Sequence, residues 1–110
     1  MTDSEAAEDG AGTSAAGDPS ALALRRTVRI VNSRGLHARA AAKLVAVAER
    51  FSSSVNVSRD GETVPASSIM GLMMLGAGVG SEIAIEADGW DAKEALEAVA
   101  GLVEAGFHED

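Results

Sequence analysis

The chain of 110 residues has no cysteine, no tyrosine, two prolines and only three aromatic side chains. Without cysteine it has no disulfide, no thiol nucleophile and no cysteine ligand for a metal. Few stacking rings and a net charge of −8 disfavour a nucleic-acid binder. The sequence also lacks an apolar run long enough to cross a bilayer and the cationic start of a signal peptide. These absences predict a cytoplasmic protein that contacts neither nucleic acid nor membrane.

Composition changes sharply near residue 24. Residues 1–24 hold five acidic residues and no lysine or arginine, and most of the remainder is Ala, Gly and Ser. Because nothing large is available to bury before Leu22 and Leu24, this segment is predicted to be a disordered acidic tail. Residues 25–110 are then expected to form one small domain.

Charge is distributed unevenly along the chain. Residues 25–59 carry eight basic residues against the single acid Glu49, and residues 60–110 carry eleven acids against Lys93 alone. We therefore expect a dipolar molecule whose basic side surrounds His37. An acidic protein surface or a phosphorylated group would suit that side.

Hydrophobic periodicity predicts four strands and three helices. The strands are expected over residues 27–31, 54–58, 62–64 and 83–87, and the helices over residues 38–51, 69–75 and 91–108. Asp60-Gly61 predicts a hairpin turn between the second and third strands. The order βαββαβα indicates an α+β open-faced sandwich, in which three helices cover one face of a four-stranded antiparallel sheet.

The ends of two helices carry recognisable capping residues. Ser68 is expected to cap the middle helix. Asp91, with Glu94 three residues later, resembles a capping box at the start of the last helix. That helix is expected to fray toward Phe107 and His108.

The middle helix is apolar on almost every side. Leu72 and Leu75 are expected to face the core, which leaves Ile69, Met70 and Met73 at the surface. Exposed methionine-rich patches suit docking to several partners, so this face is predicted to be a docking surface. The charges of Arg34 and Lys43 are expected to steer or contact the same partners.

The most informative segment is Arg34–Lys43, in which a glycine turn delivers His37 to the start of an alanine-rich helix. Backbone N–H groups of Ala38 and Arg39 could hold phosphoryl oxygens there, and the Arg39 guanidinium could neutralise charge. Neutral imidazole is a good nucleophile near pH 7. A surface histidine without chemistry stays possible on these residues alone.

A metal site is not predicted. His108 is the only other histidine, and no acid lies within ten residues of His37 in the sequence. No cofactor is expected either.

The string Gly35–Arg39, the helix Ser68–Gly76 and the order of elements resemble the HPr family, the phosphocarriers of the phosphoenolpyruvate-dependent phosphotransferase system. The likeness covers roughly residues 26–107. Where the family most often has proline after the arginine, this chain has Ala40. That departure resembles the nitrogen-related branch more than the sugar-transport branch.

The resemblance implies a monomeric carrier, not an enzyme in its own right. His37 would accept a phosphoryl group from phosphorylated Enzyme I and pass it to an enzyme IIA domain, with Arg39 assisting. The family uses Nδ1 of the histidine, although the sequence alone does not choose between the ring nitrogens. Ser68 matches the serine that an HPr kinase/phosphorylase modifies in some branches.

Two other functions stay open. A regulatory adaptor would have partners that read the phosphorylation of Ser68 or His37 without onward transfer. A small metabolite-sensing domain fits the order of elements but does not explain the string from His37 to Arg39.

Overall fold

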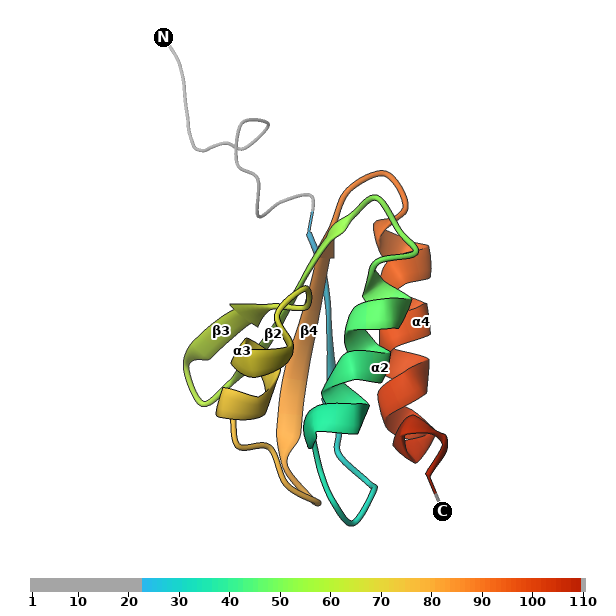
Figure 1. Cartoon of the computed structure of the whole chain (residues 1–110). Coiled ribbons are helices and arrows are strands. Elements are labelled where there is room, and N and C mark those ends of the chain that lie inside the picture. Colours follow the sequence, from blue (N-terminus) through green and yellow to red (C-terminus); the bar gives the residue numbers. More distant parts are fainter. Residues whose placement is uncertain (1–22, 110) are drawn as a thin grey trace, which may run out of the picture.

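Strands form where apolar residues repeat with a period of about two, and helices form where they repeat with a period of about 3.6. Together they build a sheet with helices packed on one face (Figure 1). The computed structural model describes residues 23–109. The elements are β1 (Leu24–Arg29), α2 (Ala38–Ala48), β2 (Ser54–Arg59), β3 (Glu62–Pro65), α3 (Ile69–Met74), β4 (Glu82–Asp88), α4 (Ala92–Glu104) and the 3-10 turn η2 (Gly106–His108).

The strands pair antiparallel in the order β1-β4-β2-β3. In the central strand β4, Ile83, Ile85 and Ala87 are buried, whereas Glu86 points to the opposite face. The register sets Ile85 beside Val57 of β2, so buried side chains line up across strands. Period-two alternation therefore gives the sheet one apolar face and one polar face.

Helices α2 and α4 lie side by side over the apolar face, and α2 also packs against α3 (Figure 1). The largest fully buried side chains come from sheet, helices and loops alike: Ile30, Leu44, Val57, Leu72, Ile83, Ile85, Val99, Val103 and Phe107. This arrangement confirms the predicted open-faced sandwich and its order of elements. In the described part of the chain, no helix has the length and apolar character to cross a membrane.

The first strand begins earlier than predicted. Leu24 to Arg29 pair with Ala87 to Glu82, so β1 starts at Leu24 instead of residue 27. Val31, which the periodicity placed in this strand, is 52% exposed beyond its end. Leu24 therefore belongs to the sheet, and residues 1–22 of the expected tail lie outside the described residues.

The end of the chain does not fray as predicted. Helix α4 ends at Glu104, and Gly106, Phe107 and His108 then adopt left-handed φ angles of 64°, 58° and 60°. Phe107 is fully buried in the core. Burial of this large ring anchors the turn and holds the following residues against α2.

The predicted capping box at the start of α4 is wrong. Asp91 is the N-cap residue, but its side chain makes no capping hydrogen bond. Its carboxylate instead accepts hydrogen bonds from the backbone N–H groups of Ser52 and Ser53, each at 2.9 Å, and from the Ser53 hydroxyl. Asp91 thus ties the start of α4 to the segment between α2 and β2.

The predicted separation of charge is cancelled in space along β1, whereas Arg34 and Arg39 beside His37 stay exposed. The antiparallel register of β1 and β4 joins Arg25 to Glu86 at 2.8 Å and Arg29 to Glu82 at 3.0 Å. Arg26 reaches Glu104 of α4 at 2.9 Å. Three of the basic residues in the first half of the domain therefore lie against acids of the second half.

Candidate functional site

The loop between β1 and α2 places His37. Gly35 has φ +67°, and a Cβ at this position would lie 2.6 Å from the Ala77 carbonyl oxygen and 2.8 Å from Gly78 Cα. The next residue, Leu36, is buried and donates its N–H to the same Ala77 oxygen at 2.9 Å. The close packing of Gly35 and the hydrogen bond of Leu36 therefore fix the loop just before His37. Only glycine fits at position 35.

His37 is the N-cap residue of α2. Its backbone is extended (φ −78°, ψ 178°), its carbonyl accepts the N–H of Ala41 at 2.8 Å, and its side chain makes no capping hydrogen bond. The first-turn N–H groups of Ala38 and Arg39 have no acceptor within the helix, as at any helix start. The imidazole thus stands beside donors and the positive end of the helix dipole, as predicted.

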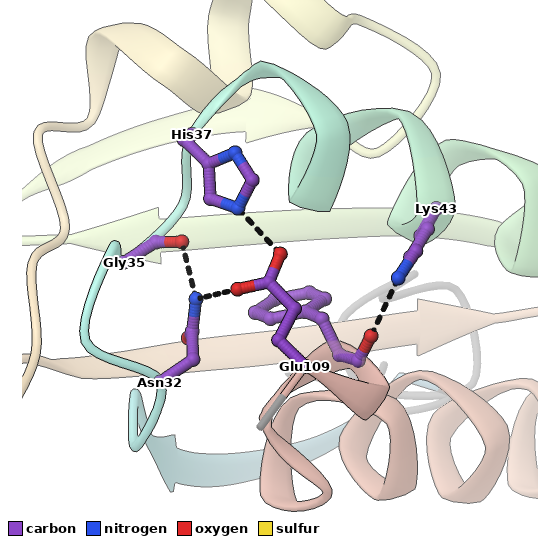
Figure 2. A network of polar contacts seen from close by, with 6 residues as sticks. Asn32, Gly35, His37, Lys43 and Glu109 are labelled. Carbon is purple, nitrogen blue, oxygen red and sulfur yellow. Dashed lines mark hydrogen bonds and ion pairs between the residues drawn. The ribbon is translucent and has the colours of Figure 1, made fainter.

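A carboxylate that sequence spacing did not suggest lies against the imidazole. His37 Nε2 is 2.6 Å from Glu109 Oε2 (Figure 2). The other carboxylate oxygen accepts a hydrogen bond of 3.1 Å from Asn32 Nδ2, which also donates to the Gly35 carbonyl at 2.8 Å. Asn32 therefore connects the loop before His37 to the carboxylate that holds its ring.

Glu109 is held in its charged form. The hydrogen bond from His37 lowers the pKa of Glu109 below its ordinary value of 4.5, and the Asn32 amide and the charges of His37 and Lys43 add to this. Burial opposes the shift, because the side chains of His37 and Glu109 are only 15% and 17% exposed. A lowered pKa keeps the carboxylate ionised at neutral pH.

The turn that precedes Glu109 is fastened to α2. Lys43 donates from Nζ to the Phe107 carbonyl at 2.8 Å (Figure 2). The Glu109 N–H donates to the Gly106 carbonyl at 3.0 Å. Lys43 was expected to be a steering charge, but it is partly buried and already engaged in this bond. Its predicted contact with partners stays a prediction.

The methionine-rich face of α3 is exposed as predicted, since Leu72 and Leu75 are buried. The exposed fractions are 39% for Ile69, 70% for Met70, 40% for Met73 and 76% for Met74. The segment that follows α3 contacts the loop before His37, because Ala77 bonds to Leu36. Because α3 also packs against α2, the two elements that carry His37 and the exposed methionines are neighbours.

Other predicted site residues lie where the sequence placed them. Ser68 caps α3, and its Oγ accepts the Gly71 N–H at 2.9 Å. Arg34 and Arg39 are exposed on either side of His37. Ala40, where the resemblance led us to expect proline, is fully buried in the first turn of α2.

Sequence reasoning missed Glu109 and Asn32. Glu109 is 72 positions from His37. No acid lies near the histidine in the sequence, but in the folded chain this one contacts it. Gly106 and the apolar Phe107 after the last helix were the only signal of a turn in that region. Within residues 23–109, no group of three or more His, Cys, Asp or Glu side chains is arranged to hold a metal ion.

Comparisons with known proteins agree on one family. The family model described as the PTS HPr component phosphorylation site matches residues 24–105. Phosphocarrier protein HPr of Cupriavidus necator is 50% identical over 86 residues, which cover 78% of this chain and 97% of the relative. Phosphocarrier protein NPr of Shewanella violacea is 42% identical, covering 78% of this chain and 94% of the relative.

A solved structure agrees as well. The crystal structure of HPr from Thermoanaerobacter tengcongensis superimposes with a TM-score of 0.76 at 42% identity, covering 79% of this chain and 98% of that one. The histidine at the start of α2, the sheet topology and these matches lead to the same conclusion: the chain belongs to the HPr family of phosphocarrier proteins of the phosphotransferase system.

Proposed function

We propose that His37 accepts a phosphoryl group from phosphorylated Enzyme I and passes it to an enzyme IIA domain. The observation that carries the proposal is the position of His37 at the open N-terminus of α2, with Nε2 engaged by Glu109. The chain would be a carrier that is modified and restored in each cycle, not an enzyme acting on a separate substrate.

The geometry supports phosphoryl chemistry at this position. N–H groups of Ala38 and Arg39 are directed outward from the first turn of α2, where they can bind oxygens of a phosphoryl group. The exposed Arg39 guanidinium adds a bidentate donor. Transfer in either direction needs little more than a positioned nucleophile and stabilised oxygens.

The surface around His37 supports docking to large partners. The exposed side chains Ile69, Met70 and Met73 offer an apolar contact, and Arg34 and Arg39 add positive charge. Such a surface fits a partner with an apolar centre and an acidic rim. Ser68 borders it, so phosphorylation of Ser68 by an HPr kinase/phosphorylase would place negative charge beside the docking residues.

The pathway is proposed from one residue and the relatives. Ala40 stands where proline is common, and relatives named NPr occur beside those named HPr. Ala40 is buried and, unlike proline, keeps its N–H, so the substitution is expected to leave phosphoryl transfer intact. We favour the nitrogen-related branch over uptake of a particular sugar.

The test is to incubate the protein with phosphoenolpyruvate and Enzyme I and to map the label by intact mass and acid lability. We expect one acid-labile phosphoryl group, which His37→Ala abolishes while the protein stays folded. His108→Asn is the matched control, because it removes the only other histidine and asparagine tolerates the left-handed φ of 60°. A label that survives in His37→Ala would refute the proposal.

A further inference from the structure

The contact between His37 and Glu109 bears on which nitrogen of the ring reacts. A carboxylate can only accept hydrogen bonds, so the nitrogen that faces it at 2.6 Å must carry the proton. In the neutral ring this leaves Nδ1 without a proton and with a free lone pair. In Figure 2, Nδ1 lies on the side of the ring away from Glu109.

We propose that Glu109 is a positioning residue that holds His37 as the Nε2–H tautomer, directs the incoming phosphoryl group to Nδ1 and balances the charge that the transfer creates. The inference rests on the proposed function, and it assigns to Glu109 a part in the same step.

The carboxylate is itself rigidly placed, as a positioning role requires. Asn32 Nδ2 donates to Glu109 Oε1 at 3.1 Å, and Asn32 is almost fully buried. Phe107 and His108 both adopt left-handed φ angles, which residues other than glycine usually avoid. The fully buried Phe107 ring and the Lys43 hydrogen bond maintain this turn. Backbone strain of this kind clusters at functional sites, where a side chain is held in one orientation.

The charge balance of the transfer needs a group at the position of Glu109. When the Nδ1 lone pair forms the new N–P bond, the bond between phosphorus and the donor breaks, and the donor keeps that electron pair. The ring still carries the Nε2 proton, so it becomes a phosphorylated imidazolium with one positive charge. Glu109 faces that proton and stabilises the cation, and it does the same in the reverse direction.

The charged groups around the pair fit this scheme. Lys43 of α2 is the cation close enough to Glu109 to affect it, and its Nζ is bound to the Phe107 carbonyl rather than to the carboxylate. Glu109 therefore keeps its negative charge directed at His37, and among residues 23–109 its second oxygen accepts a hydrogen bond only from the Asn32 amide.

The test uses phosphoramidate, a small donor that phosphorylates imidazole with release of ammonia, so that it does not depend on Enzyme I. Nitrogen-15 NMR of the ring reports the tautomer, and phosphorus–nitrogen coupling reports which nitrogen is modified. Wild-type protein is expected to show the Nε2–H tautomer and modification at Nδ1 alone. Glu109→Ala is expected to give mixed tautomers, product at both nitrogens and loading slowed about 10- to 100-fold.

Two further variants separate position from charge. Glu104→Gln removes an acid of α4 that pairs with Arg26, and it should behave as wild type. Glu109→Gln keeps one acceptor oxygen but no charge, so it should largely retain modification at Nδ1 while its loading stays slow. Backbone NMR spectra confirm that each variant is folded.

Each result decides the inference. If Glu109→Ala keeps the wild-type ring signals, or is loaded at Nδ1 alone and at the wild-type rate, the loop and helix position the ring and the inference is wrong. If phosphoramidate bears it out but Enzyme I does not load the protein, the proposed function fails and the positioning role stands.

Discussion

Gly35 lies directly against the backbone of Ala77: a Cβ at Gly35 would meet the Ala77 carbonyl oxygen at 2.6 Å. Both the contact and the φ of +67° demand glycine. Because this oxygen also accepts the N–H of Leu36, the approach sets the path of the chain into His37. The turn before the histidine and the segment after α3 are therefore one structural unit.

Gly35→Ala should destabilise the domain by about 3 kcal/mol, since backbone strain and a steric clash add at one position. The melting temperature should fall by roughly 10 °C or more, as measured by calorimetry. Gly61→Ala is the matched control, because Gly61 has φ +86° but no atom within 4 Å of the added Cβ. Equal losses in both variants would show that the contact with Ala77 does not matter.

Arg39→Glu should slow phosphoryl transfer from Enzyme I by at least about tenfold at low salt, because it reverses an exposed charge beside His37. Stopped-flow transfer assays at several ionic strengths measure the effect, which salt should reduce. Arg50→Glu makes the same change at an exposed position beyond the other end of α2. If both variants slowed phosphoryl transfer equally, net charge rather than the location of Arg39 would be responsible.

Ser68 allows the cap to be separated from charge. Asp and Asn both cap helices well, so Ser68→Asp and Ser68→Asn should unfold at temperatures close to wild type, whereas Ser68→Ala should lose about 1 kcal/mol. Only Ser68→Asp adds a negative charge beside the proposed docking surface. Titration calorimetry with Enzyme I should therefore show weaker binding for Ser68→Asp alone, and equal affinities for the two capping variants would contradict this.

Asp91 gives the domain a defined response to acid. The Ser53 hydroxyl lowers the pKa of Asp91 below its ordinary value of 3.8, and the N–H groups of Ser52 and Ser53 contribute. A carboxyl whose pKa is lower in the folded state stabilises the fold above its unfolded pKa, and this stability is lost as the pH falls through the folded value. The pKa of Glu109 is also lowered in the folded state, so its contribution to stability is lost on acidification in the same way.

Melting curves between pH 7 and about pH 2 should thus show falling stability below roughly pH 4. Asp91→Ala should be less stable at pH 7 and should lose less on acidification. Glu94→Gln serves as the control, because Glu94 is exposed and the capping box does not form. A wild-type acid response in Asp91→Ala would show that the Ser52 and Ser53 contacts are not important.

Sequence reasoning predicted the elements with strong periodicity, along with the places of His37, Arg39 and Ser68. The alternation of apolar residues in β4 and the apolar face of α2 depend only on the spacing of nearby residues, which can be read directly from the sequence. The exposed methionines of α3 followed from volume, since one short helix cannot bury all its apolar residues.

The remaining features depend on tertiary contacts. Glu109 reaches His37 only because three successive left-handed residues turn the chain back, and φ angles of Phe107 and His108 have no sequence signature. The Asp91 carboxylate could accept either from the first N–H groups of α4 or from a loop distant in sequence. It accepts from the loop, at Ser52 and Ser53. Part of the charge asymmetry is cancelled because strand pairing, which the linear count ignores, sets opposite charges together.

Onward transfer of the phosphoryl group from His37 is tested most directly by a chase experiment. The protein is loaded on His37, freed of Enzyme I and phosphoenolpyruvate, and mixed with an enzyme IIA domain. The label is expected to leave His37 and to appear on the enzyme IIA domain in stoichiometric amount. If the label stays on His37 while the two proteins bind, the chain is a regulatory adaptor, and the carrier account is wrong.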